Sequence, residues 1–266
     1  MLLKSLPKKK FYGMSAVGGK AAAVVAAFAK GVNFNGATYI ASSPADTALT
    51  TTDGKRWICS LWFRATIAPG EWSTLFGNST GRGFSISKSP DGSIYFAGAD
   101  SAADNALTVI ASAAPIVDTA VWHHLLVAAD NTSTPVGRVV LDGVLQGTNG
   151  FAYNALNVNF AAANTKTIGA NMGYSFGTGD VAELYIAHNQ YLDLTVSANV
   201  LKFRSVSGHP VDLGTSGATP TGTAPTCYFS VRAPSGVHND FLTNRGTGGL
   251  TWAVAGGTLG LATVDP

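Results

Sequence analysis

The acidic side chains decide whether this sequence could break glycosidic bonds. Retaining glycosidases place two carboxylates about 5–5.5 Å apart, which on one strand requires acids at even spacing. The chain has only two glutamates, Glu71 and Glu183, and Asp180 stands at odd spacing from Glu183. On a regular strand Asp180 and Glu183 would face opposite ways. We therefore expect no enzyme, with an aspartate pair from two distant strands as the remaining alternative.

Two adjacent histidines, His123 and His124, are the next candidates for chemistry. Neighbouring strand residues point to opposite faces, so these two cannot chelate one metal ion together. We expect one ring to pack inside and the other to meet solvent. No nucleophile elbow is expected, because Gly77-x-Ser79-x-Gly81 and Gly173-x-Ser175-x-Gly177 have the Gly-x-Ser-x-Gly spacing but are followed by expected strands and not by a helix. Gly246-x-Gly248-Gly249 lacks the residues that follow in a phosphate loop.

The two cysteines, Cys59 and Cys227, are too few for a disulfide framework. Cys59 lies in an apolar stretch, where a small buried thiol is the usual case. A bridge between them would require neighbouring strands. We expect two reduced, buried thiols and no cofactor.

The composition is that of a strand-and-turn protein. The chain has 266 residues, 31 of them glycine, and only 12% charged residues against a usual quarter. With so few glutamates, long surface helices are not expected. No apolar stretch is long enough to predict a membrane span.

Residues 1–30 form a basic arm, because every charged side chain before Asp46 is a lysine. We expect Lys4, Lys8, Lys9 and Lys10 to anchor this arm to a partner surface. A solvated, disordered terminus is the alternative. Residues 21–29 also resemble a signal peptide, although their core is mostly alanine.

Residues 122–129 and 138–145 form the hairpin around which the remaining strands are arranged. Apart from the histidines, both faces of 122–129 are apolar, which predicts a strand buried on both sides. Asp142-Gly143 predicts a tight turn in the second run.

Other short apolar runs predict further strands, with turn residues such as Pro90-Asp91-Gly92 between them. Trp57, Trp62 and Trp122 are expected in the core. We expect one short helix within 192–204 and a surface loop at 207–226. The expected strands are 32–40, 56–65, 72–77, 83–87, 93–97, 107–111, 167–170, 179–187, 227–231 and 250–254. Their number and spacing predict an all-β, two-sheet antiparallel sandwich.

The order of several motifs over residues 32–190 resembles laminin-G-like, concanavalin A-like jelly rolls. These motifs are Phe34-x-Gly36, Ser60-Leu61-Trp62-Phe63, Gly83-Phe84-Ser85-Ile86, Trp122-His123-His124-Leu125, Leu141-Asp142-Gly143, Ile168-Gly169 and Gly179-Asp180-Val181-Ala182-Glu183-Leu184. The resemblance implies two curved antiparallel sheets. Laminarinase-type glucanases share that fold and carry Glu-x-Asp-x-x-Glu on one strand, a run that this chain lacks.

The last third is similar to the C-terminal part of laminin-G-like proteins of tailed bacteriophages. The similarity rests on Phe203–Gly214, on Pro220-Thr221-Gly222-Thr223-Ala224-Pro225 and on Asn244-x-Gly246-x-Gly248-Gly249. This resemblance implies a virion component.

We divide the chain into the arm at 1–30, a jelly roll at 31–197, and a C-terminal extension at 198–266 that completes the sandwich and adds an edge hairpin.

Binding residues are expected on loops and strand ends, where aromatic rings stack on sugars and planar groups bond hydroxyls. The glycan candidates are Trp72, Asn78, Arg82, Asn171 and Tyr174. Some relatives hold calcium on rim loops, which makes Asp180 and Asn171 the candidate ligands here. Rim packing or plain solvation is the alternative for each of these residues.

The function expected from these observations is a non-enzymatic structural or decoration protein of a bacteriophage virion, on the capsid or tail. Its partners would be other virion proteins, and it would occur in several copies. The alternative is a carbohydrate-binding receptor or adhesion module, on the virion or as a secreted lectin. No specific nucleic-acid site is expected.

Overall fold

The computed structural model describes most of the chain after the basic arm. The described residues are 30–43, 48–65, 73–78, 84–99, 105–111, 120–153, 157–161, 163–171, 174–175, 178–232 and 238–266. The arm lysines Lys4, Lys8, Lys9 and Lys10, and the glycan candidates Trp72 and Arg82, lie outside these residues. Among the described residues, none of the helices has the length and apolar character needed to cross a membrane.

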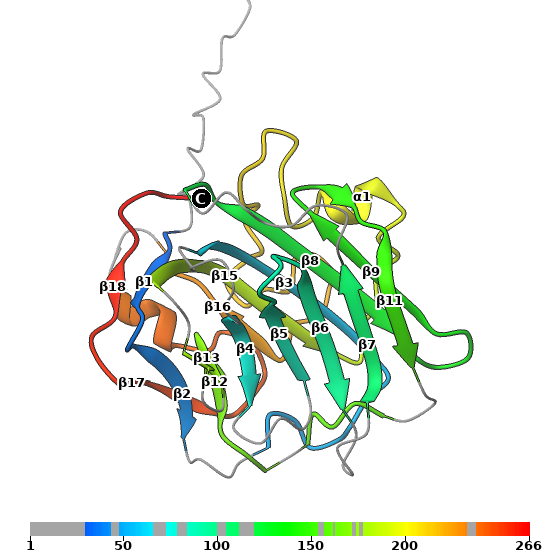
Figure 1. Ribbon diagram of the computed structural model, residues 1–266, viewed down its shortest axis with the longest axis horizontal. Helices are drawn as coiled ribbons and strands as arrows, with labels where there is room; N and C mark the ends of the chain where they lie inside the picture. Colours follow the sequence, from blue (N-terminus) through cyan, green and yellow to red (C-terminus); the bar gives the residue numbers. More distant parts are fainter. Residues whose placement is uncertain are drawn as a thin grey trace, which may run out of the picture.

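The first of two large antiparallel sheets, the central sheet, contains the longest strands (Figure 1). In order across the sheet, its strands are β10 (Val144–Leu145), β9 (Val136–Leu141), β8 (His123–Asp130), β3 (Arg56–Ala65), β15 (Thr178–His188), β1 (Val32–Asn35) and β18 (Gly260–Leu261). β16 (Cys227–Phe229) also pairs with β15. Asp142 and Gly143 join β9 to β10 with φ values of 52° and 83°, which confirms the predicted tight turn.

The second, the front sheet, packs against one face of the central sheet. Its strands are, in order, β11 (Thr148–Tyr153), β7 (Asn105–Ala111), β6 (Ile94–Ala99), β5 (Phe84–Lys88), β4 (Ser73–Asn78), β12 (Lys166–Ile168), β2 (Tyr39–Ser43) and β17 (Thr251–Ala255). The Ser89–Ser93 turn joins β5 to β6 and includes the predicted Asp91-Gly92 pair. The all-β, two-sheet sandwich predicted from the sequence is confirmed.

Aromatic rings form the centre of the core between the two sheets. Trp57 is fully buried and stacks on Phe96, with ring centroids 5.8 Å apart and an interplanar angle of 14°. Phe84 and Phe160 complete this cluster around the indole. Alternation along β3 places Trp57, Cys59, Leu61 and Phe63 on the face that points into this core, as predicted.

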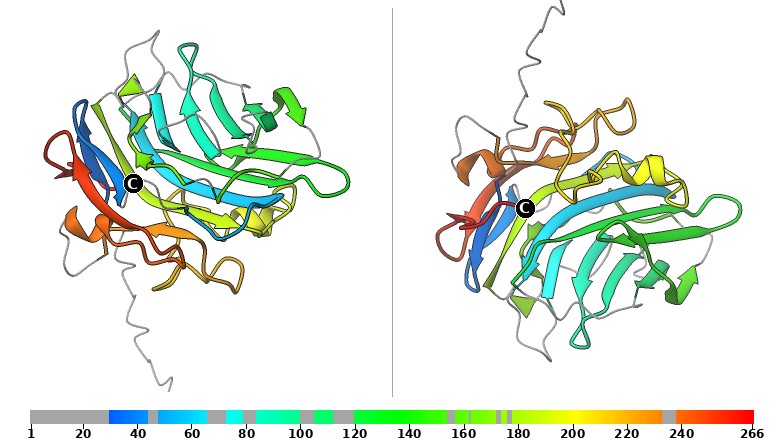
Figure 2. Two further views of the ribbon diagram at one scale, coloured as in Figure 1. Left: turned by 90° about the horizontal axis from the view of Figure 1, so that it is seen from below. Right: turned by 90° about the horizontal axis from the view of Figure 1, so that it is seen from above.

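The opposite face of the central sheet is also covered. Residues 189–226, the cover layer, lie on the far side of this sheet from the front sheet (Figure 2). The layer holds the short helix α1 (Ser197–Val200), within the predicted window. Leu194, Phe203 and Leu213 of the layer pack on a second apolar cluster that includes Tyr185 of β15. The prediction of a surface loop at 207–226 is therefore wrong for Leu213, which is buried.

The residues after the cover layer complete both sheets. β16 extends the central sheet, and the 3₁₀ helix η1 (His238–Leu242) then leads toward β17 at the edge of the front sheet. β18 pairs with β1 in the central sheet. β17 and β18 thus belong to different sheets, so they are not the edge hairpin expected within 198–266.

Two smaller predictions have mixed outcomes. Cys59 and Cys227 are free and buried, as expected; both stand opposite Ile186, on strands that flank β15 from either side. Trp122 lies outside the core: its ring is partly exposed beside Gly31, and its Nε1–H donates to the Val264 carbonyl. The C-terminal segment supplies this acceptor, which local sequence around Trp122 does not reveal.

Candidate functional site

A short hairpin at the rim brings two of the predicted glycan residues together. β13 (Ala170–Asn171) pairs with β14 (Tyr174–Ser175), and the register sets Asn171 directly opposite Tyr174. The hairpin follows β12 along β4, because Ile168 pairs with Phe76 and Gly169 N–H donates to the Leu75 carbonyl. The hairpin therefore continues toward the beginning of β4, the strand that comes directly after Trp72.

Asn78, the third candidate with a described backbone, lies at the other end of the same strand. It closes β4 and pairs with Lys166. A strand of this length spans about 15–20 Å, so Asn78 and the Asn171–Tyr174 pair are separated by most of it. The three candidates with a described backbone thus divide into two groups, at the two ends of β4.

The calcium candidate Asp180 lies inside β15 and is buried. One carboxylate oxygen accepts a hydrogen bond from Asn33 Nδ2 at 2.7 Å, and the other accepts one from Arg64 Nε at 2.7 Å. Arg64 also forms an ion pair with this carboxylate. Both oxygens are already bonded, so Asp180 is poorly placed as a metal ligand, and the described residues contain no cluster of three or more His, Cys, Asp or Glu side chains for a metal.

Glu183 is buried three residues further along β15. It adopts a positive φ of 48°, and the register with β3 shifts between Ala182 and Tyr185. Its carboxylate accepts hydrogen bonds from the Tyr228 hydroxyl at 2.7 Å and from the Ser230 hydroxyl. Burial raises the pKa of Glu183 above its usual range, although the two hydroxyls oppose this shift.

The bulge at Glu183 overturns the prediction that Asp180 and Glu183 face opposite ways. Across the ladder, Asp180 stands opposite Arg64 and Tyr185 opposite Ser60, and these two β3 residues share one face. That face is the one under the cover layer, where Glu183 bonds Tyr228. An extra residue in a strand changes the alternation, so spacing alone placed Glu183 wrongly.

The Glu183 carboxylate belongs to a polar group that ties the cover layer to the central sheet. Arg232 donates to the Tyr228 hydroxyl at 2.8 Å, and its guanidinium also reaches Asp212 and the Gly214 carbonyl in the cover layer. Burial raises the pKa of the Tyr228 hydroxyl, so Tyr228 stays protonated at neutral pH. These contacts fix the layer in place and leave the carboxylate without access to solvent.

His123 and His124 point to opposite faces of β8, as predicted. His123 packs beside Phe63 and bonds Asp142 at 2.7 Å, so it is not the solvated ring that we expected. The His124 ring is fully buried, stacks on Trp62 with centroids 4.7 Å apart, and bonds the Ser60 hydroxyl at 2.9 Å. Burial lowers the pKa of His124 to about 3, which keeps the ring neutral.

The Ser60–His124 pair has the atoms of a nucleophile and its base but not their setting. Both side chains are buried, and Asp142 bonds the His124 backbone N–H at 2.8 Å and the His123 ring instead of the His124 ring. A catalytic serine must reach a substrate and needs a base oriented by a third group. We interpret this cluster as structural.

Comparison with protein families gives one match. Residues 34–192 match the model described as the concanavalin A-like lectin/glucanases superfamily. The comparison with curated proteins found no match.

Several solved structures are similar to the chain. A candidate carbohydrate-binding protein from Bacteroides ovatus aligns with a TM-score of 0.58 and 13% identity, over 90% of this chain and 61% of that one. The binding domain of Paraclostridial Mosquitocidal Protein 1 aligns with a TM-score of 0.48 and 13% identity, over 68% and 47%. Domains LG4-5 of the mouse laminin alpha1 chain align with a TM-score of 0.44 and 19% identity, over 63% and 43%. The chain thus spans less than two thirds of each of these structures.

Proposed function

The chain belongs to the concanavalin A-like lectin/glucanases superfamily, and from this premise we propose that it is a non-enzymatic carbohydrate-binding module. The main argument against catalysis is the environment of the two acidic residues of β15. Asp180 is ion-paired with Arg64, and Glu183 is buried under the cover layer with both oxygens bonded. Neither carboxylate can approach a sugar, whereas glycoside hydrolysis requires two that flank the scissile bond.

The observation that carries the binding proposal is the register of the rim hairpin, which sets Asn171 opposite Tyr174. Sugars are bound by an aromatic ring that packs on their C–H face and by planar polar groups that bond their hydroxyls. Trp72 precedes the nearby β4, so we propose that it extends this site. Asn78, at the other end of β4, and Arg82, four residues later in the sequence, would form a second contact. The fold shared with the Bacteroides ovatus candidate is consistent with such a role.

A glycan array probed with the full chain tests this proposal. We expect retention on at least one class of polysaccharide, reduced several-fold by Tyr174→Ala or Asn171→Ala because stacking or hydroxyl contacts are lost. Tyr95→Ala, which changes a partly buried tyrosine of β6, is the matched control and should bind normally. Absence of binding by the wild-type chain to all bacterial and host glycans on the array would reject the proposal.

We also propose that the module works on the surface of a bacteriophage particle, capsid or tail, beside other virion proteins and in several copies. The support for this proposal is the resemblance of Phe203–Gly214 to laminin-G-like proteins of tailed bacteriophages. This segment lies in the cover layer, where Phe203 and Leu213 are buried. The basic arm would supply the anchor. The Lys30 N–H donates to the Val231 carbonyl, which ties the last residue of the arm to the fold.

Deleting residues 1–29 tests the anchor. We expect a folded body that is no longer incorporated into particles, while replacing Lys4, Lys8, Lys9 and Lys10 with glutamine should give the same loss without shortening the chain. Normal incorporation of both variants would contradict an anchoring arm.

A further inference from the structure

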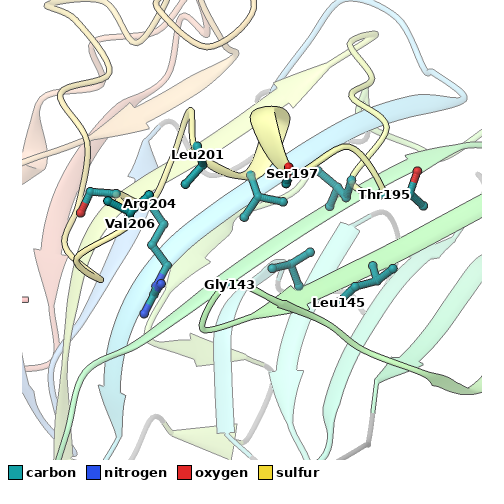
Figure 3. A pocket seen from close by; sticks show the side chains of 11 residues that line it. Gly143, Leu145, Thr195, Ser197, Leu201, Arg204 and Val206 are labelled. Carbon is teal, nitrogen blue, oxygen red and sulfur yellow. The ribbon is translucent and has the colours of Figure 1, made fainter.

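A pocket of about 270 Å³ lies between the β9–β10 turn and the cover layer. Figure 3 shows Gly143 and Leu145 on one side, with Thr195, Ser197, Leu201 and Arg204 facing them from the cover layer. The walls are mostly aliphatic. Val140, Leu194 and Val200 form the buried part, and this volume is close to the lower end of small-molecule sites.

The mouth of the pocket is unusually apolar for a surface. Three large hydrophobic side chains that line it are exposed: Val206 is 88% exposed, and Leu145 and Leu201 are each 44% exposed. The exposed Val144 and Val196 are sequence neighbours of lining residues. Exposed apolar side chains that cluster around a hollow mark a binding site more often than scattered ones do.

Arg204 brings a positive charge into these apolar surroundings. Its Nε atom is buried, and its guanidinium donates no hydrogen bond and forms no ion pair with any described residue. Its charge is felt by its neighbours, because it helps to lower the pKa values of Asp142 and His124. Arg204 as a whole is only partly buried and lines the pocket, so an anion there would give its guanidinium an acceptor.

Two glycines leave space for the guanidinium. A Cβ atom at Gly143 would lie 3.0 Å from Nη1 of Arg204, and one at Gly208 would lie 3.0 Å from Nη2. Both glycines have φ above 80°, a conformation that other residues rarely adopt. The two turns thus lie directly beside the two terminal nitrogens of the guanidinium.

We propose that this pocket binds a small organic carboxylate with a short aliphatic body. A guanidinium pairs with a carboxylate through two parallel hydrogen bonds, and the aliphatic walls suit a hydrocarbon chain. No aromatic or amide side chain lines the pocket in the described part of the chain, which argues against a sugar. The site is separate from the rim hairpin, so this inference does not depend on the proposed glycan binding.

Hexanoate is the probe, titrated into the full ¹⁵N-labelled chain. We expect a saturable shift of the Arg204 Nε–Hε signal as the carboxylate pairs with the guanidinium of which this group is a part. The Arg56 Nε–Hε signal is the internal control, because it already donates to Asp130 at 2.8 Å and should not move. Hexanol tests the apolar contribution alone, and glucuronate tests whether an acidic sugar is preferred.

Two substitutions separate charge from packing. Arg204→Gln should weaken hexanoate binding about tenfold or more, since charge-assisted hydrogen bonds are lost. Leu201→Glu introduces a negative charge at the exposed mouth, which would repel the carboxylate of hexanoate. It should therefore weaken binding more than the neutral Leu201→Gln does. Because Leu201 is exposed, both variants should fold. The proposal is overturned by the absence of a saturable shift, by equal binding of hexanol or glucuronate, or by unchanged binding in both charge variants.

Discussion

The two faces of the central sheet are both buried but are built differently. The inner face presents Trp57, Leu61 and Phe63 to the front sheet, in a core of aliphatic and aromatic side chains. The outer face carries Ser60, Arg64, His124, Asp180 and Glu183 beside its apolar cluster, and each of these polar side chains has a bonded partner. One face is stabilised by packing, whereas the other also depends on a hydrogen-bonded polar group.

This difference explains why the cover layer is part of the fold. Charged and polar groups can be buried only when partners satisfy them, and Tyr228, Ser230 and Arg232 supply those partners for Glu183 and its surroundings. Arg232 in turn bonds Asp212 in the layer. The layer thus closes the outer face over the Glu183 carboxylate.

The inner face should be the more sensitive to truncation. Trp57→Ala removes a fully buried indole packed against Phe84, Phe96 and Phe160, and should lower the free energy of unfolding by about 3–5 kcal/mol. Trp122→Ala, at a partly exposed indole, is the control and should lower it much less. Urea unfolding followed by circular dichroism measures both. Equal effects would refute the assignment of the main core to the inner face.

On the outer face, Arg64→Met should have the next largest effect. It leaves the buried Asp180 carboxylate with only its Asn33 bond, which should lower the free energy of unfolding by about 3 kcal/mol at neutral pH. A change of under about 0.5 kcal/mol, the range of ordinary surface substitutions, would contradict a structural role for this ion pair.

Glu183→Gln tests the polar group through its pH dependence. The folded-state pKa of Glu183 is raised above 4.5, so its contribution to stability is complete below that pH and is lost as the pH rises through the folded-state pKa. The wild-type chain should therefore lose stability relative to Glu183→Gln as the pH rises, by at most about 1.4 kcal/mol per pH unit. The titration of His124 is the same in both proteins, so it does not contribute to the difference in their stability. A difference in the free energy of unfolding between the two proteins, measured with urea, that stays constant from pH 4 to 8 would contradict a buried carboxylate.

The smallest effect is expected at the other end of β3, where Arg56 pairs with Asp130 at 2.8 Å in an exposed setting. Arg56→Gln should lower the free energy of unfolding by about 0.2–1 kcal/mol, because solvent already screens this pair. A loss as large as that of Arg64→Met would show that burial does not distinguish the two ion pairs.

Much of the inner face could be predicted from the sequence, because alternation along β3 and the Asp142-Gly143 turn are local signals. The strand at 122–129 was also correctly predicted as buried on both sides. The cover layer was not predicted. Its sequence at 207–226 is rich in Gly, Thr, Ser and Pro, which is typical of exposed loops, yet Leu213 and Thr226 within it are buried.

The candidate sites were harder to predict for a related reason. The bulge at Glu183 has no glycine to mark it, so the face of this acid could not be read from spacing. Asn171 and Tyr174 could be chosen as rim residues, but their pairing depends on the hairpin register. Arg204 belongs to no motif of known chemistry, and its importance comes from the turns at Gly143 and Gly208 that the fold brings beside it.

The most direct test of binding without cleavage is to incubate the chain with each glycan that it retains and to measure new reducing ends. We expect none above the buffer control, because the Asp180 and Glu183 carboxylates are buried and bonded. Release of reducing sugar that Glu183→Gln abolishes would contradict this account.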